Sequence, residues 1–332
     1  MVDLAPSRGK EVLRADGITI EARHRRRGRG VIARDVSLAI HEGEIVGLIG
    51  ESGSGKTLTA KALLGLLPRG VRASAGSARL KGVDLLSLAP DALRRVRGEE
   101  IALIPQDALH ALNPVMTVGA QVGEPFVIHR GAKWAAALRQ AVDLLALVQL
   151  PEPEKRIAEY PHQFSGGMQQ RAMIAMGLAL GPSLIVADEP TTALDVTVQA
   201  RILALVRQLR DRTGAAFLFI THDLGIVGEL CDWVYVMYAG QVVEAGATRR
   251  IFADPRHPYT RALIAATPPI ARRADRLAAI PGQIPSPFEP TPGCRFAARC
   301  TRLFARCAAE PPPVDVAPGH MARCWLAEDG HG

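Results

Sequence analysis

One loop of this sequence has the residue types that surround a bound triphosphate: Gly50, Glu51, Ser52, Gly53, Ser54, Gly55, Lys56 and Thr57. Its glycines let backbone N–H groups close around phosphate oxygens, and a helix that begins near Lys56 points its positive end at them. We expect Lys56 to reach the β- and γ-phosphates and Thr57 to offer its hydroxyl to Mg²⁺. The loop therefore predicts a site for a nucleoside triphosphate and Mg²⁺.

Two acidic residues and a histidine supply further chemistry for phosphate cleavage. Asp188 is placed to hold Mg²⁺, Glu189 to orient or deprotonate the attacking water, and His222 to contact the γ-phosphate and that water. An isolated acidic pair after a strand more often caps a helix, and a lone histidine at a strand end is more often structural. The phosphate loop upstream favours the catalytic interpretation.

A third element, residues 164–171, reads Phe-Ser-Gly-Gly-Met-Gln-Gln-Arg. Alone, Ser165, Gly166 and Gly167 would indicate a flexible turn. Here they precede an apolar helix expected at residues 168–180, whose N-terminus exposes N–H donors. The element looks like the signature sequence of ATP-binding cassette (ABC) ATPases. In that family the segment completes the ATP site of an opposite cassette, so the resemblance implies that Ser165 to Met168 act in trans.

Three short apolar runs must position these side chains: residues 45–50, 184–187 and 216–220. Strands that are apolar on both faces belong to a parallel sheet covered by helices. Ligands bind at the carboxyl ends of such strands, where the polar candidates lie. We therefore expect an α/β fold with a mainly parallel sheet.

Composition changes along the chain predict its domains. Residues 133–150 combine strong helix formers with apolar residues at three- and four-residue intervals, until Pro151 and Pro153. We predict a helical subdomain at about residues 107–180, inside an ATPase domain of residues 1–253. Prolines then gather at residues 281–292, and four of the five cysteines follow. Residues 254–332 are predicted to form a short C-terminal extension.

The overall composition, with 48% hydrophobic and 22% charged residues, is that of an ordinary globular protein. The net charge of +7 suggests nucleic acid or anionic lipid as a partner. Four arginines lie in residues 24–30, where we expect a solvated hairpin loop first and attraction to an anionic membrane surface second. No aromatic residues interleave with them, so we expect no nucleic-acid partner.

The sequence predicts neither a membrane span nor a secretory signal. No apolar run approaches the roughly 20 residues that cross a bilayer, and the first residues lack the apolar stretch of a signal peptide. We therefore expect the protein in the cytoplasm.

Five stretches resemble the D-type ATP-binding subunit of bacterial dipeptide and oligopeptide ABC importers: residues 106–117, 164–180, 188–200, 221–225 and 257–263. Met168 resembles the D-type subunit more than its F-type companion. The similarity extends from about Ile45 to Cys324. It implies an ABC-type P-loop NTPase fold: a RecA-like core, a β-rich N-terminal patch, a helical subdomain and a short cysteine-containing C-terminal extension.

The resemblance also implies roles for single residues. Gln106 would join the catalytic residues and ligate Mg²⁺ together with Thr57 and Asp188. Gln106 and the segment after it would also respond to the coupling helix of a membrane permease. Asp195 would lie in the loop that communicates between two cassettes.

The implied function is ATP hydrolysis that drives the uptake of di- and oligopeptides, by a peripheral subunit at the cytoplasmic face of the inner membrane. The implied partners are a second ABC ATPase subunit (an F-type companion or another copy) and two transmembrane permease subunits. An extracytoplasmic solute-binding protein would help choose the cargo. Alternatives are another small solute, such as nickel or glutathione, and a soluble ABC ATPase that acts on DNA or ribosomes. The latter typically has two cassettes or a long coiled-coil insertion, which this sequence lacks.

The tail cysteines allow three interpretations. Disulfides are disfavoured in a reducing cytoplasm. Gaps of five, six and sixteen residues differ from those of structural zinc sites. Cys294, Cys300, Cys307 and Cys324 resemble the cysteine tail of peptide-importer ATPases, which favours a [4Fe–4S] cluster. Zinc and unligated packing thiols remain as alternatives. Cys231 stands apart and is expected to be a small buried apolar residue.

One departure from the family pattern concerns the adenine. ABC cassettes usually stack the base on an aromatic residue ahead of the phosphate loop, yet no Phe, Tyr or Trp precedes Phe126. Another group must face the base. His24 and the neighbouring arginines are planar candidates, and Val31 is an apolar one.

Overall fold

The chain divides into two compact units in a computed structural model that describes residues 9–192, 194–267 and 280–328. The first unit is formed by Met1–Ser87 and Ile220–Gly332, and the second by Leu88–Phe219. The division falls inside strand β8, Ala216–Thr221.

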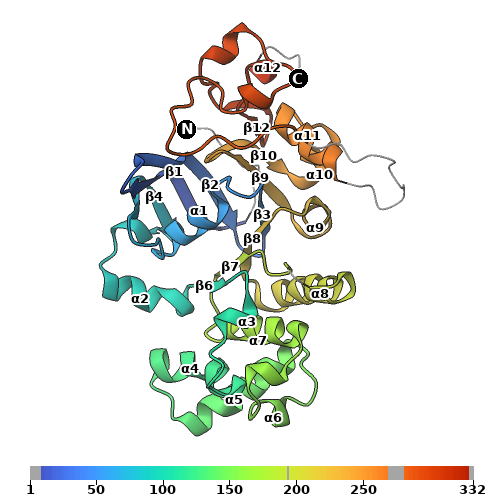
Figure 1. The fold of residues 1–332 in the computed structure, drawn as a ribbon. Helices are drawn as coiled ribbons and strands as arrows, with labels where there is room; N and C mark the ends of the chain where they lie inside the picture. The colour runs from blue at the N-terminus through green and yellow to red at the C-terminus, as the bar shows by residue number, and fades with distance from the viewer. Residues whose placement is uncertain (1–8, 193, 268–279, 329–332) are drawn as a thin grey trace. The chain divides into compact units, whose positions relative to one another are not determined.

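An antiparallel sheet forms the N-terminal part of the first unit, with strand order β2-β1-β4-β5 (Figure 1). Strands β1, Glu11–His24, and β2, Gly28–His41, form a long hairpin. Strand β4, Val71–Leu80, pairs with β1 and with the short β5, Val83–Asp84. This sheet is the β-rich patch that the resemblance implied.

The strand that leads into the phosphate loop lies in a second sheet. In the first unit its order is β11-β12-β10-β9-β3, and β3 runs parallel to β9. Every residue of β3 and β9 is buried, which explains their continuous apolar runs. The strands are β3, Ile45–Ile49; β9, Trp233–Tyr238; β10, Gln241–Ala247; β11, Val314–Ala317; and β12, His320–Ala322.

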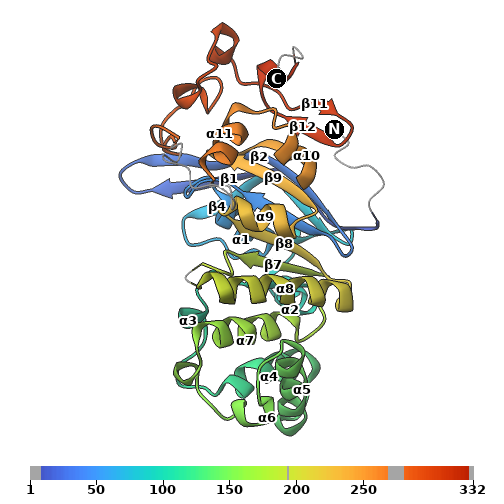
Figure 2. The same ribbon diagram turned by 90° about the vertical axis from the view of Figure 1, so that its right-hand side faces the viewer.

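Short helices complete the first unit. The α-helices are α1, Lys56–Leu63; α9, Leu224–Leu230; α10, Thr248–Ala253; α11, Pro258–Ala266; and α12, Trp325–Glu328. The 3-10 turns are η1, Leu85–Ser87; η3, Ala297–Arg299; and η4, Ala305–Ala308. In Figure 2, α10 and α11 lie close to β9 and β12 of the same unit.

The C-terminal extension folds onto this unit. Strand β12 pairs with β10 and so adds to the sheet. The ring of Phe296 lies 5.1 Å from that of Tyr238 and 5.4 Å from that of Tyr259, centroid to centroid. These aromatic contacts and the strand pairing explain why the extension falls in the same compact unit as the phosphate loop. The domain boundary at residue 253 stays a prediction.

The second unit contributes parallel strands. Strand β6, Ile101–Ile104, runs parallel to β7, Leu184–Asp188, and β8 lies on the other side of β7. The apolar runs at 45–50, 184–187 and 216–220 are therefore strands, as predicted.

Helices form the rest of the second unit, and Figure 1 shows α4, α5 and α6 gathered together. A buried core is formed by Phe126 of α4, Ala137 of α5, and Ala179 and Leu180, which directly follow α7. The helices are α2, Pro90–Glu99; α3, Ala108–Ala111; α4, Val118–Arg130; α5, Trp134–Leu147; α6, Pro153–Arg156; η2, Pro161–Gln163; α7, Gly166–Leu178; and α8, Val196–Thr213.

Helix α5 confirms the helix predicted at residues 133–150 but ends earlier than the two prolines require. Gln149 has a φ of 58°, in the left-handed region, and its N–H donates to the oxygen of Ala146. This turn ends the helix before Pro151. The local turn therefore sets the end of α5, and the two prolines only prevent the helix from continuing after the turn.

In the described part of the chain, no helix is both long enough and apolar enough to cross a membrane.

Candidate functional site

The phosphate loop wraps around the ammonium group of Lys56. Lys56 Nζ donates to the oxygens of Gly50 at 2.7 Å and Glu51 at 3.0 Å, and the side chain is buried. Gly50 follows β3 with a φ of 149°, and a Cβ there would lie 2.1 Å from the oxygen of Met237. Only glycine fits at this position. The loop therefore presents backbone N–H groups and a cation at the start of α1, an arrangement that suits phosphate.

A tight turn between β9 and β10 ties the loop to β2. The N–H of Gly240 donates to the oxygen of Ser54, and the oxygen of Gly240 accepts from the N–H of Arg34, both at 2.8 Å. A Cβ on Gly240 would lie 2.1 Å from the oxygen of Ile32. This close approach requires glycine, and it holds β2 next to the phosphate loop.

A second clamp joins the loop to the C-terminal extension. The Arg299 guanidinium donates two hydrogen bonds to the Glu51 carboxylate, at 2.7 and 2.9 Å, and the Arg299 side chain is only 4% exposed. The Glu51 N–H donates to the hydroxyl of Tyr259. The hydrogen bond with Glu51 raises the pKa of Arg299 above its usual value. Arg299 was not among the predicted site residues, because no local sequence pattern marks Glu51, 248 positions away, as its partner.

In the second unit, Gln106 and Glu189 are brought together. Gln106 Nε2 donates to Glu189 Oε2 at 3.2 Å, although the residues are 83 positions apart. Thr192 Oγ1 donates to the same carboxylate oxygen at 3.0 Å. Glu189 itself has a φ of 47°, which is unusual for a residue other than glycine. Such backbone conformations cluster at functional sites. Thr192 was not among the residues predicted for the site.

The other candidates lie at the predicted element ends. Asp188 is the buried last residue of β7, and His222 directly follows β8. Thr57 lies in the first turn of α1 beside Lys56. Their positions fit the order of the sequence motifs. Their roles as Mg²⁺ ligands and catalytic groups stay predictions.

The signature segment and Asp195 each cap a helix. Ser165 Oγ accepts from the N–H of Met168 at the start of α7. Asp195 Oδ1 accepts from the N–H of Val198 at the start of α8. A Cβ on Gly167 would lie 2.7 Å from Val198 Cγ1, so the two helix starts pack closely. Figure 2 shows α7 and α8 side by side.

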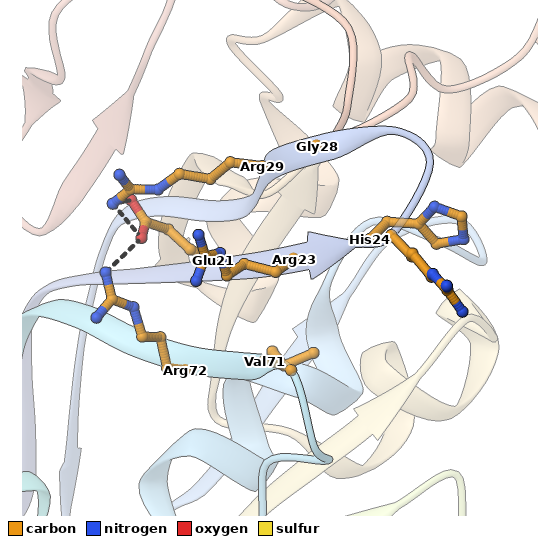
Figure 3. A pocket seen from close by; sticks show the side chains of 9 residues that line it. Glu21, Arg23, His24, Gly28, Arg29, Val71 and Arg72 are labelled. Carbon is orange, nitrogen blue, oxygen red and sulfur yellow. Dashed lines mark hydrogen bonds and ion pairs between the residues drawn. The ribbon is translucent and has the colours of Figure 1, made fainter.

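The arginine-rich run forms the turn between β1 and β2, as the hairpin interpretation predicted. Figure 3 shows the open hollow of about 920 Å³ that it borders. Glu21 Oε2 lies 2.5 Å from Arg29 Nη2 and 3.4 Å from Arg72 Nη2. One carboxylate thus offsets part of the local positive charge. His24 lies near the turn, where its Nδ1 accepts from the N–H groups of Arg26 and Arg27.

The iron–sulfur prediction for the tail is wrong. Cys294, Cys300, Cys307 and Cys324 border one small apolar hollow, of about 10 Å³. Among the residues that the structure describes, however, no group of three or more His, Cys, Asp or Glu side chains is arranged to hold a metal ion. This finding supports neither the cluster nor the zinc alternative.

These thiols lie in a largely apolar environment. Burial raises the pKa of Cys294 to about 11 and also raises the pKa of Cys300 and Cys324. All four cysteines are free of disulfides, and Phe296 and Phe304 line the same hollow. They therefore pack against apolar side chains.

Cys231 is buried, as expected. Its Sγ packs so close to Gly47 that a Cβ added to this glycine would lie 3.2 Å from the sulfur. Burial raises the pKa of the Cys231 thiol.

Two family models match the chain. Residues 33–192 match the model described as ABC transporter, and residues 243–307 match the model described as the C-terminal region of oligopeptide and dipeptide transporters. The first match includes the phosphate loop, Gln106, the signature segment and Glu189. The second includes Tyr259, the proline-rich stretch and Arg299.

Relatives that match most of the chain are also found. A Sinorhizobium fredii protein described as "Probable peptide ABC transporter ATP-binding protein" is 48% identical over 297 residues, 89% of each chain. A Brucella abortus protein named for peptide import and ATP binding is 48% identical over 290 residues, 87% of each chain. A solved ATP-binding cassette, titled as a dimer in a post-hydrolysis state with ADP and phosphate, has a TM-score of 0.64 and 27% identity. It covers 71% of this chain and 99% of its own. The expected cassette fold is confirmed.

Proposed function

Since the chain belongs to the family of ABC transporter ATP-binding proteins, we propose that it hydrolyses ATP to power the import of dipeptides and oligopeptides. The match of residues 243–307 to the oligopeptide and dipeptide transporter region is the observation that supports this cargo. Relatives that are 48% identical along most of their length are named for peptide transport. ATP and Mg²⁺ are the cofactors of such a cassette.

The proposed mechanism divides the work among residues of the described motifs. The backbone of residues 50–55 and Lys56 bind the phosphates, which the loop geometry supports. Bound Mg²⁺, held by Thr57, Gln106 and Asp188, would neutralise charge on the β- and γ-phosphates.

Glu189 takes the proton of the attacking water, and His222 contacts the γ-phosphate. The hydrogen bonds from Gln106 and Thr192 orient the Glu189 carboxylate, and they support its role as the base. The same contact connects the catalytic glutamate to the segment that follows Gln106.

The signature segment is proposed to act on the nucleotide of a second cassette. Its residues Ser165 to Met168 begin α7, where N–H groups at a helix N-terminus favour phosphate. Val196, near the inter-cassette candidate Asp195, is 82% exposed, which suits a surface that a second cassette covers. The partner is either an F-type companion or a second copy of this chain.

The remaining partners are two transmembrane permease subunits and, indirectly, an extracytoplasmic solute-binding protein. Val115, in the segment after Gln106, is 79% exposed and offers an apolar contact for a permease. The chain would then lie at the cytoplasmic face of the inner membrane as a peripheral subunit. No role in nucleic-acid binding is proposed.

Reconstitution tests this function. The chain is assembled in lipid vesicles with its permease pair, solute-binding protein and companion ATPase, and phosphate release and peptide uptake are measured together. We expect both to rise when dipeptides or oligopeptides are added outside. Stimulation by nickel or glutathione, but not by peptides, would identify another cargo. Hydrolysis that depends on DNA or ribosomes would contradict the transporter role.

The composition of the ATPase pair is tested in the same vesicles. Omission of the companion ATPase abolishes uptake if the pair is mixed, and leaves uptake intact if this chain pairs with itself. The Lys56→Ala variant serves as the control that cannot hold the phosphates.

A further inference from the structure

A cavity of about 250 Å³ lies beside the phosphate loop in the first unit. Its lining includes Gly53 of the loop, Val31 and Ile32 of β2, and Phe288 from the extension. Whole ligand pockets typically measure about 300–1,000 Å³, so this cavity has the size for one part of a ligand. When the loop holds the triphosphate, the remaining parts of the nucleotide are its ribose and base.

The extension reaches this cavity through a segment that we call the strap, residues 280–292. The N–H of Val31 donates to the oxygen of Pro287 at 2.9 Å. A Cβ on Gly30 would lie 2.6 Å from Phe288 Cδ1 and 2.8 Å from the oxygen of Pro287. Gly30 therefore leaves the space that the strap needs to pack directly on β2.

The other end of the strap is fixed to the phosphate loop. Arg299, which binds the Glu51 carboxylate, also donates to the oxygens of Ile280 at 3.2 Å and Pro281 at 2.7 Å. One buried guanidinium thus holds the loop and the strap together. The position of Phe288 is in this way linked to the loop that binds the phosphates.

The cavity contains an aromatic side chain, which the sequence ahead of the phosphate loop lacks. No aromatic residue precedes Phe126, and Phe288 is the one aromatic side chain among the described residues that line the cavity. Phe288 is half-buried and lines this cavity. Aromatic rings bind nucleobases by stacking.

The earlier candidates for the base fit less well. His24 is absent from the cavity lining and borders the open hollow of Figure 3 instead. Its ring meets Phe288 edge to face, at 5.7 Å between centroids and 66° between planes. Val31 does line the cavity and can provide an apolar contact opposite or beside the ring.

We propose that Phe288, supplied by the C-terminal extension, is the face on which the base of the bound nucleotide stacks. The proposal rests on the proposed function, because it takes the loop at residues 50–57 as the ATP site. Stacking accepts any base, so Phe288 raises the affinity for ATP and for GTP alike. The extension thereby completes the nucleotide site of its own cassette.

Binding measurements on the full-length protein test this role. Dissociation constants for ATP, GTP and inorganic tripolyphosphate, each with Mg²⁺, are measured by calorimetry. We expect Phe288→Ala to weaken the binding of ATP and of GTP about five- to hundredfold, which is the range that stacking on one aromatic residue contributes. Tripolyphosphate has no base, so its affinity stays within about twofold.

Two further variants keep the test decisive. Phe288→Trp retains an aromatic face and is expected to bind ATP like the wild type. Phe304→Ala removes an equally half-buried phenylalanine elsewhere in the extension, and is expected to leave ATP affinity unchanged. These variants separate the loss of a stacking face from a general loosening of the extension.

Three results would overturn the proposal. Phe288→Ala could bind ATP as well as the wild type. Phe288→Ala could instead lose affinity for ATP and for tripolyphosphate by the same factor, which would mean that Phe288 only supports the phosphate loop. The wild-type protein could also bind tripolyphosphate as tightly as ATP. The phosphate site would then be present, but the base would contribute no stacking energy. A wild-type protein that bound neither ligand would contradict the ATPase function itself.

Discussion

At the scale of single residues, Glu189 adopts a backbone conformation that is unfavourable for a residue other than glycine. Its φ of 47° lies in the left-handed region, which costs a residue other than glycine about 1–3 kcal/mol. Hydrogen bonds from Gln106 and Thr192 converge on one oxygen of its carboxylate. This combination of backbone strain and fixed side chain is typical of a catalytic position.

We therefore predict that Glu189→Gln reduces ATP turnover by about 100- to 10,000-fold, the usual contribution of a general base. The amide has nearly the same shape but cannot accept the proton, so ATP binding is expected to remain. Phosphate release and nucleotide affinity are measured in the assembled transporter. Glu154→Gln, the same change at an exposed site on α6, is the matched control. Near-wild-type turnover in Glu189→Gln would exclude Glu189 as the base.

A buried histidine predicts a pH dependence. Burial lowers the pKa of His257 from 6.5 to about 4, partly offset by the nearby Glu244 carboxylate. His257 Nδ1 accepts from the N–H of Tyr259, as a neutral imidazole can. Between pH 6.5 and 4 the unfolded chain binds a proton that the folded chain does not. His257 therefore stabilises the fold above pH 6.5, and this contribution is lost as the pH falls through that window.

We expect the free energy of unfolding to fall by up to about 3 kcal/mol from this residue between pH 6.5 and 4. Chemical denaturation at several pH values measures it. His257→Asn keeps a side chain that can cap α11 but does not titrate, so its stability should vary less with pH. Equal pH slopes for the two proteins would show that His257 is not the group responsible.

At the scale of elements, the close packing of α7 on α8 depends on one glycine of the signature segment. A Cβ on Gly167 would lie 2.7 Å from Val198 Cγ1, which is closer than real Cβ atoms approach. A Cβ on the neighbouring Gly166 would lie 3.6 Å from Leu194 Cδ2, an ordinary contact. The two glycines therefore differ in their structural requirement, although they are adjacent in the sequence.

Gly167→Ala is predicted to destabilise the protein by about 1–3 kcal/mol through overpacking, whereas Gly166→Ala should cost much less. Thermal unfolding compares the stability of the two variants. It is measured without nucleotide, so that a role of these glycines at the ATP site of a second cassette does not affect the result. Adding Val198→Ala to Gly167→Ala should restore part of the lost stability, because it removes the clashing methyl groups. Equal effects of the two single changes would mean that α7 and α8 do not pack in this way.

At the scale of the whole molecule, the extension is joined to the nucleotide site through buried polar contacts. Arg299 links Glu51 of the phosphate loop to the strap, and Glu244 of β10 accepts hydrogen bonds from His257 and His320. These residues come from distant parts of the chain but belong to one compact unit. Changes in the extension are therefore expected to reach the phosphate loop.

We predict that Arg299→Lys weakens both stability and ATP affinity, because an ammonium group cannot replace the two-pronged contact with Glu51. A double-mutant cycle of Arg299→Lys with Glu51→Gln should give a coupling of about 0.5–3 kcal/mol. Arg302→Lys, the same change at an exposed position in the extension, is the control. Strictly additive effects would show that the two side chains do not act together.

Features that depend on neighbouring residues could be predicted from the amino-acid sequence alone. The apolar runs became β3, β7 and β8, and the glycine-rich loop formed between β3 and α1. These outcomes follow from hydrophobic periodicity, helix capping and glycine conformation, each of which acts within a few residues.

Contacts between residues that are distant in the sequence became visible only in the folded chain. Gln106 contacts Glu189 across 83 positions, and Arg299 contacts Glu51 across 248. The strap reaches β2 because Gly30 leaves space for Phe288. The family resemblance suggested a metal cluster for the tail cysteines, yet among the described residues no group of three or more His, Cys, Asp or Glu side chains is arranged to hold a metal ion. Cysteine spacing records only the separation along the chain, whereas the arrangement of these side chains around one apolar hollow depends on the packing of the whole fold.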